Sequence, residues 1–229
     1  MAEPPSPLKA VLFDLDGTLM ETAPEIADAL NDTLARWGLA PVDLAQVQGW
    51  IGDGARTTLA RALAHAAAQG GQPPELATAW DGYAHDYERR TGTHSHVHAG
   101  VVSLLQRLRA RGLACAVLTN KPQAFARKVL AAHGLEAAFD LVVGGDTLPV
   151  HKPDPAVMHH ALAALGVAAL EAVLVGDSVI DVRTARAAGV AVWVVRHGYP
   201  AGRFEGADAP DGFIEHFDAF EPKGPAQSA

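Results

Sequence analysis

Short apolar runs alternate with longer amphipathic stretches over most of the chain. The first run, at 10–13, is Ala-Val-Leu-Phe, and from Gly100 onward strand-like runs and helical periodicity follow one another in turn. Alternation of this kind predicts a parallel sheet with helices on both of its faces. The predicted strands are 10–13, 113–118, 141–143, 173–175 and 190–195, with 213–214 as a short edge strand, and the predicted helices between them are 101–111, 123–133, 156–165 and 179–188.

The segment from about 21 to 92 contains no strand-like run. Its apolar residues recur at helical spacing, as in Ile26, Leu30 and Leu34, and further helices are predicted at about 43–49, 55–69 and 74–90. We therefore expect an α/β fold in which a doubly wound parallel sheet, Rossmann-like, carries an all-helical insertion. The expected parts are a core of 8–20 and 94–220, an insertion at 21–93, and flexible tails at 1–7 and 221–229.

Composition limits the partners that the chain can have. The net charge of −8 argues against a nucleic-acid surface, although a local cationic site could still bind a small anion. The single cysteine, Cys115, fits a reducing compartment. No apolar run is long enough to cross a bilayer, and the start of the sequence does not have the pattern of a signal peptide. We expect a cytoplasmic monomer or homodimer that binds neither nucleic acid nor membrane.

Chemically active side chains follow four of the predicted strands. Because ligands bind at the carboxyl ends of parallel strands, we expect these side chains to meet at one edge of the sheet. The first pair, Asp14 and Asp16, would repel each other unless a cation or a proton lies between them. The candidate residues are Asp14, Asp16, Thr119, Asn120, Lys152, Asp177 and Asp181.

These residue types are the ones that phosphoryl transfer requires. A carboxylate can attack phosphorus and form an aspartyl-phosphate, and clustered carboxylates are ligands that Mg²⁺ prefers. A lysine and a hydroxyl can stabilise the equatorial phosphate oxygens as charge builds up. A second carboxylate can act first as a general acid and then as a general base. We expect an enzyme with Mg²⁺ as its cofactor and a small phosphorylated metabolite as its substrate.

The four segments resemble, in order and over about 8–220, the motifs of the haloacid-dehalogenase superfamily of phosphohydrolases. The resemblance implies that Asp14 is the nucleophile and that Asp16 is the general acid/base. It also implies that Asp14, the backbone carbonyl of Asp16, and Asp177 bind Mg²⁺. Asp181 would bind the ion directly or orient its water ligands.

The same resemblance assigns roles to the remaining candidates. Thr119, with Asn120 beside it, would bind the phosphoryl group, and Lys152 would neutralise charge on the nucleophile and the phosphate. From its position alone, and not from the resemblance, Lys121, the residue after Asn120, is a candidate for phosphate support. The helical insertion resembles the mobile cap that these enzymes insert after the first motif.

Within the superfamily, the chain is most similar to the bacterial phosphoglycolate phosphatases. The most specific segment is Gly144-Gly-Asp-Thr-Leu-Pro149. This similarity implies hydrolysis of 2-phosphoglycolate. Alternatives are a phosphatase of another small or sugar phosphate, or a phosphomutase of the same superfamily. A 2-haloacid dehalogenase is disfavoured, because its chemistry needs neither Mg²⁺ nor the second carboxylate.

Two smaller features are open to more than one interpretation. The glycine-rich segment 49–54 is either a connector between helices or, by the resemblance, a loop that closes over the active site. Gly52 in this loop and Arg56 beyond it are candidate substrate-binding residues, although an arginine at such a position is usually a surface residue. The alternating histidines of 94–98 could form a metal site, but we favour a solvated hinge.

Overall fold

The computed structural model describes residues 7–199 and 203–222, so that 1–6 and 223–229 of the expected tails lie outside the described residues. Six parallel strands form one sheet, in the order β5-β4-β1-β6-β7-β8. The predicted α/β fold with a parallel sheet is confirmed. The strands are β1 (Ala10–Phe13), β4 (Ala114–Leu118), β5 (Leu141–Val143), β6 (Ala172–Gly176), β7 (Ala191–Val195) and β8 (Gly212–Ile214).

Strand β1 lies in the middle of the sheet, between β4 and β6. The chain adds β4 and β5 on one side of β1 and then β6, β7 and β8 on the other, which makes the sheet doubly wound. At such a switch point the loops leave the strand ends in opposite directions and open a crevice between them. The loops after β1, β4 and β6 therefore border the same space.

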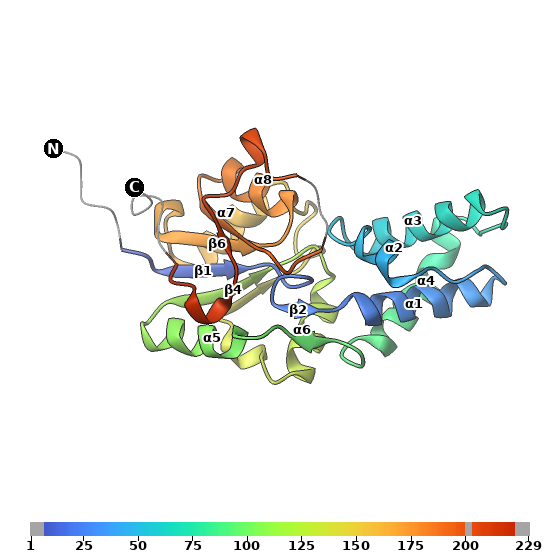
Figure 1. Cartoon of the computed structure of the whole chain (residues 1–229), viewed down its shortest axis with the longest axis horizontal. Coiled ribbons are helices and arrows are strands. Elements are labelled where there is room, and N and C mark those ends of the chain that lie inside the picture. Colours follow the sequence, from blue (N-terminus) through green and yellow to red (C-terminus); the bar gives the residue numbers. More distant parts are fainter. Residues whose placement is uncertain (1–6, 200–202, 223–229) are drawn as a thin grey trace.

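Helices cover both faces of the sheet, as Figure 1 shows. Helices α5 (Val101–Ala110) and α6 (Gln123–Ala132) lie on one face, and α7 (Pro155–Leu165) and α8 (Val179–Ala187) on the other. Successive side chains of a strand point to opposite faces. Accordingly, Val11 and Phe13 of β1 pack with α5 and α6, whereas Ala10 and Leu12 pack with α7 and α8.

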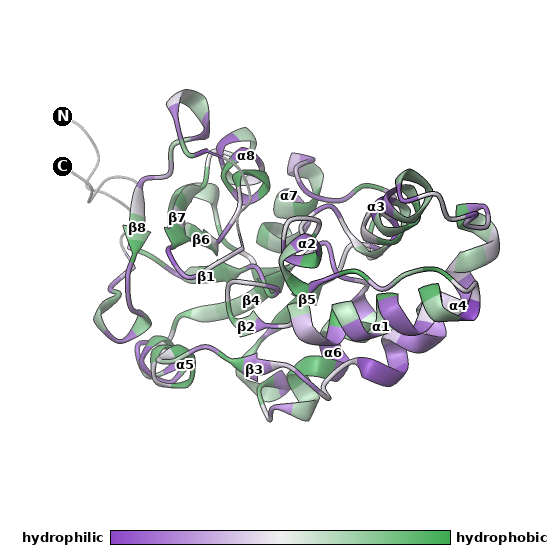
Figure 2. Ribbon diagram, turned by 45° about the vertical axis from the view of Figure 1, so that its right-hand side comes forward, coloured by the Kyte–Doolittle hydropathy of each residue, from purple (hydrophilic) through white to green (hydrophobic). Residues whose placement is uncertain are grey.

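Four helices form a separate block beside the sheet, which we call the helical block (Figure 1). They are α1 (Ala23–Arg36), α2 (Leu44–Gln48), α3 (Ala55–Ala68) and α4 (Leu76–Arg90). The block has its own apolar cluster, which includes Leu30, Leu34 and Leu59. Figure 2 shows that the strands of the sheet are largely hydrophobic, whereas much of α1 in the block is hydrophilic. No helix in the described part of the chain is both long and apolar enough to span a membrane.

Two short strands connect the helical block to the sheet. Strand β2 (Met20–Glu21) pairs antiparallel with β3 (His96–Val97), so that the chain enters and leaves the block side by side. The alternating histidines of 94–98 led us to expect a solvated hinge and no strand, because a strand of two residues is too short to be predicted from sequence. Short 3₁₀ helices occur at η1 (Glu136–Ala138), η2 (Ala169–Glu171), η3 (Gly206–Asp208) and η4 (Phe217–Ala219).

Candidate active site

The loops at the carboxyl edge of the sheet bring acidic and basic side chains together. Asp14 follows β1 directly, and Asp177 follows β6. Asp181 lies in the first turn of α8, where a capping box with Ser178 fixes the start of the helix. Lys152 comes from the loop between β5 and α7. The structure therefore collects these residues from three separate loops.

Three carboxylates in this site lie within reach of one ion. Asp14, Asp177 and Asp181 are buried, and one oxygen of each lies within 4.8 Å of the others. The amine Nζ of Lys152 lies 3.1 Å from Oδ1 of Asp14 and 2.6 Å from Oδ1 of Asp181. Three carboxylates against one ammonium leave two negative charges, which one divalent cation would balance. The donor set, all carboxylate oxygen, fits Mg²⁺.

The pKa values in this cluster reflect its excess of negative charge. Burial raises the pKa of Asp14 to about 6, with Lys152 opposing the shift and Asp181 adding to it. Burial and the charges of Asp14 and Asp181 raise the pKa of Asp177 well above its usual range. Burial alone would lower the pKa of Lys152, but Asp14 and Asp181 raise it, so the amine stays protonated.

Asp177 is packed tightly between two loops. The hydroxyl of Thr18 donates to its Oδ1 at 3.2 Å, and the N–H of Tyr199 donates to its Oδ2 at 2.9 Å. A Cβ atom on Gly17, where φ is +80°, would lie 2.3 Å from Asp177 Oδ2. A Cβ on Gly198 would lie 2.1 Å from the Cβ of Asp177. Both positions therefore require glycine for the carboxylate to lie where it does.

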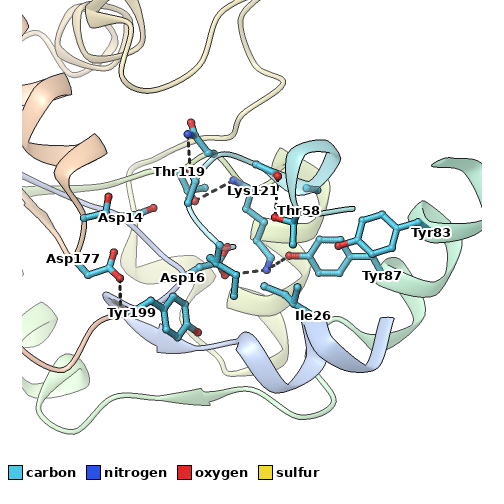
Figure 3. Close-up of a pocket in the computed structure, with 16 residues that line it drawn as sticks. Asp14, Asp16, Ile26, Thr58, Tyr83, Tyr87, Thr119, Lys121, Asp177 and Tyr199 are labelled. Carbon is cyan, nitrogen blue, oxygen red and sulfur yellow. Dashed lines mark hydrogen bonds and ion pairs between the residues drawn. The ribbon is translucent and has the colours of Figure 1, made fainter. Parts of the chain in front are cut away.

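Asp16 is oriented by a different set of partners. Its Oδ1 accepts a hydrogen bond from the Thr22 hydroxyl at 2.6 Å. It also accepts one from Nζ of Lys121 at 3.0 Å (Figure 3). The same Nζ donates to the hydroxyl of Tyr87 at 2.7 Å. Lys121, which the sequence indicated as phosphate support, thus pairs with the second aspartate and with the helical block.

Thr119 and Asn120 follow β4 and differ in what they offer a ligand. The hydroxyl oxygen of Thr119 accepts from the N–H of Lys121 at 3.2 Å and lines the pocket. The side-chain amide of Asn120 donates to the carbonyls of Gly52, at 2.8 Å, and of Lys152, at 3.0 Å, and accepts from the N–H of Lys152 at 2.9 Å. Both amide hydrogens of Asn120 are therefore used to join loops.

A pocket lies between this edge of the sheet and the helical block. Its empty volume is about 490 Å³, which includes space open to solvent. Arg56 does not line it: the guanidinium is exposed, and its Cζ lies 4.5 Å from the centre of the Trp80 ring. The lining includes Asp14, Asp16, Thr119, Asn120, Lys121, Asp177, Ser178 and Tyr199 from the core and Ile26, Ile51, Gly52, Thr58, Tyr83 and Tyr87 from the block.

Sequence reasoning did not identify the tyrosines of the pocket. Tyr83 and Tyr87 lie on α4, four residues apart, which is also the spacing of ordinary core residues. Tyr199 lies in a turn-rich loop after β7, and this position at the carboxyl edge of the sheet was the one signal available. The alternating histidines make other contacts: His94 bonds Asp28, and the ring of His98 packs at a tilt against that of His197.

Comparisons with known proteins agree with this geometry. The family model of haloacid dehalogenase-like hydrolases matches residues 11–195. The phosphoglycolate phosphatase of Thiobacillus denitrificans is 40% identical over 199 residues, which are 87% of this chain and 88% of that protein. The phosphoglycolate phosphatase of Rhodospirillum rubrum is 44% identical over 194 residues, which are 83% of this chain and 80% of that protein.

Solved structures lead to the same family. The crystal structure of a predicted phosphoglycolate phosphatase from Haemophilus somnus has a TM-score of 0.87 and 30% sequence identity. The match covers 92% of this chain and 95% of that one. The resemblance inferred from the motifs is thereby confirmed, and the chain belongs to the haloacid dehalogenase-like hydrolases.

Proposed function

We propose that the protein is a Mg²⁺-dependent phosphatase that hydrolyses 2-phosphoglycolate through an aspartyl-phosphate on Asp14. The observation that carries the proposal is the buried cluster of Asp14, Asp177 and Asp181, with the amine of Lys152 paired to Asp14 and Asp181. The names of the related phosphoglycolate phosphatases support the choice of substrate.

Asp14, Asp177 and Asp181 would hold the metal ion, together with the backbone carbonyl of Asp16. When bound, Mg²⁺ offsets the negative charge of the phosphate as the carboxylate approaches it. Lys152 lies next to Asp14 and is protonated, so it can bind a phosphate oxygen and keep the nucleophile ionised. The hydroxyl of Thr119 can donate to another phosphate oxygen.

Asp14 is oriented for attack by its own backbone surroundings. Its Oδ1 accepts from the N–H of Leu15 at 2.7 Å and forms an ion pair with Lys152, whereas its Oδ2 makes no hydrogen bond in the described part of the chain. In the first step a carboxylate oxygen of Asp14 forms a bond to phosphorus, and the bond from phosphorus to the ester oxygen breaks. Asp16 gives its proton to the departing oxygen, which leaves as an alcohol.

The second step restores the enzyme. Asp16, now ionised, takes a proton from a water molecule, whose oxygen attacks the phosphorus of the aspartyl-phosphate. The bond between phosphorus and Asp14 breaks, and inorganic phosphate is released. Thr22 and Lys121 orient Asp16 by hydrogen bonds during both steps.

We further propose that the helical block, residues 21–93, is a cap that opens and closes over a core of 8–20 and 94–220. The paired strands β2 and β3 would be its hinge. The hydrogen bond from Asn120 to the carbonyl of Gly52 joins the loop at 49–54 to the core and would hold the cap closed. Closure of this kind would exclude bulk water from the aspartyl-phosphate.

The test is release of phosphate from 2-phosphoglycolate, measured with Mg²⁺ and with EDTA. We expect Asp14→Asn to lower kcat by about a thousandfold or more, because a carboxamide is not a nucleophile. Asp208→Asn, the same change in a surface ion pair with Arg183, should keep full activity. Unchanged release with Asp14→Asn, or undiminished release in EDTA, would contradict the mechanism.

A panel of phosphate esters tests the substrate separately. We expect the highest kcat/KM for 2-phosphoglycolate. A higher value for a sugar phosphate would reject this substrate and leave the phosphatase chemistry intact. Transfer of the phosphoryl group to a second hydroxyl of a sugar phosphate, with no phosphate released, would indicate a phosphomutase instead.

A further inference from the structure

The pocket wall next to Asp16 is rich in hydrogen-bond donors. Lys121 comes from the loop after β4, and Tyr83 and Tyr87 come from one side of α4 (Figure 3). Only 3% of Lys121, 0% of Tyr83 and 2% of Tyr87 are exposed. Buried polar groups are nearly always paired, so the partners of these three groups indicate what the site can accept.

The amine of Lys121 sets the direction of the hydrogen bonds around it. An ammonium group only donates, so in its 2.7 Å contact with Tyr87 the phenol oxygen accepts. The O–H of Tyr87 is therefore left to donate, and within the described residues it has no acceptor. The other contact of Nζ is Oδ1 of Asp16 at 3.0 Å, which leaves a third N–H on Lys121.

The hydroxyl of Tyr83 is also available. It is buried, lines the pocket and has no hydrogen-bond partner in the part of the chain that the structure describes. Its ring centre lies 5.5 Å from that of Tyr87, so the two phenols share one side of the pocket. An unpaired buried hydroxyl destabilises the folded state, and a bound acceptor removes that cost. The hydroxyls of Tyr83 and Tyr87 and one N–H of Lys121 thus have no hydrogen-bond acceptor within the described residues, and a bound anion could accept from all three. The negative charges that already face Lys121 are those of Asp16 and of the buried Glu25.

We propose that Lys121, Tyr83 and Tyr87 bind the carboxylate of the substrate, so that the enzyme selects phosphate monoesters with a second anionic group beside the ester carbon. This inference rests on the proposed phosphatase function, which places Asp16 at the ester oxygen. In 2-phosphoglycolate only a methylene group separates that oxygen from the carboxylate. Lys121 contacts Asp16, so the donors lie on the side of the pocket that the carboxylate would occupy.

Replacing Tyr83 by Phe is the sharpest test, because the change breaks no hydrogen bond within the described residues. We expect Tyr83→Phe to lower kcat/KM for 2-phosphoglycolate about tenfold, mainly through KM. For 2-hydroxyethyl phosphate, which has a hydroxymethyl group in place of the carboxylate, kcat/KM should change less than about twofold. An equal change for both esters, or no change for either, would overturn the proposal.

A matched variant separates this effect from general damage to the pocket. Tyr199→Phe removes a hydroxyl from the same pocket, but one that is already bonded to Thr22, Ala23 and Glu21. It should change kcat/KM for the two esters by the same factor, whatever that factor is. A carboxylate-specific loss in Tyr199→Phe would place the carboxylate elsewhere and contradict the subsite.

Binding measured without turnover distinguishes this inference from the proposed function. In calorimetric titrations, Asp14→Asn protein should bind 2-phosphoglycolate about tenfold more tightly than 2-hydroxyethyl phosphate, and adding Tyr83→Phe should remove the preference. Equal binding of the two esters overturns the subsite even if the enzyme is active. If Asp14→Asn protein prefers 2-phosphoglycolate but the wild type releases phosphate from neither ester, the proposed reaction is contradicted and the subsite is supported.

Discussion

Gly17 has a positive φ and lies against Asp177. A side chain at Gly17 would strain the backbone, and its Cβ would lie only 2.3 Å from Oδ2 of Asp177. We expect Gly17→Ala to lower the free energy of unfolding by about 2–4 kcal/mol and to weaken Mg²⁺ binding, because Asp177 has to move. Urea unfolding and titration with Mg²⁺ measure the two effects.

A second glycine provides the control for backbone strain alone. Gly38 also has a positive φ, +65°, but a Cβ added there meets nothing within 4 Å. Gly38→Ala should cost only about 1 kcal/mol and leave Mg²⁺ binding unchanged. Equal losses in the two variants would mean that contact with Asp177 contributes nothing.

At the scale of single residues, the acidic groups could be predicted from sequence but the tyrosines could not. Asp14 and Asp177 directly follow buried apolar strands, where a charged residue has no structural use, so their position points to chemistry. Tyr83 and Tyr87 also pack in the apolar cluster of the helical block. Only the tertiary structure shows that their hydroxyls line the pocket.

At the scale of elements, Tyr199 joins the loop after β7 to the start of α1. Its hydroxyl oxygen accepts from the N–H groups of Thr22 and Ala23 at 2.9 Å and 2.8 Å, and it donates to Glu21 at 2.8 Å. The first N–H groups of a helix have no partner within the helix, so this phenol satisfies them.

We expect Tyr199→Phe to lower the free energy of unfolding by about 1–2 kcal/mol and to speed hydrogen exchange at Thr22 and Ala23. Tyr83→Phe is the matched control, because the Tyr83 hydroxyl has no partner in the described part of the chain. It should leave exchange unchanged and should not lower stability, because it removes a buried hydroxyl that has no partner within the described residues. Equal stability of the two variants would contradict the role of Tyr199.

Most helices and strands could be predicted because their apolar residues recur at a regular spacing or because a glycine marks where they end. β1 is a continuous apolar run, and α5 ends just before Gly112, as its pattern indicates. Strand β8, expected from Phe213 and Ile214, also lies at the edge of the sheet. Strands β2 and β3 were not predicted, because their pairing joins residues far apart in sequence, Glu21 and His96.

At the scale of the whole molecule, the uncompensated charge of the site links folding to pH. Because Asp14 has a pKa of about 6 in the folded chain and 3.8 ordinarily, the folded state holds a proton more tightly than the unfolded state between these values. In the absence of metal, the contribution of Asp14 to the free energy of unfolding is therefore greatest at low pH and is lost as the pH rises through about 6.

We expect metal-free Asp14→Asn to be more stable than the wild type above pH 6 by about 1–3 kcal/mol, with the difference shrinking toward pH 4. Mg²⁺ should stabilise the wild type more than the variant, since binding to the folded state alone adds to its stability. Thermal unfolding in EDTA and in Mg²⁺ at several pH values measures both. A pH-independent difference would show that Asp14 keeps its ordinary pKa.

Asn120 links two parts that behave differently in the proposed cycle. Its amide holds both the N–H and the carbonyl of Lys152 within the core, and a single bond reaches across to Gly52. If the block opens as proposed, this bond and the one from Lys121 to Tyr87 would break, while Lys152 would keep its place. The groups around Asp14 would then stay assembled between turnovers, and the tyrosines of α4 would join them only as the block returns over a new substrate.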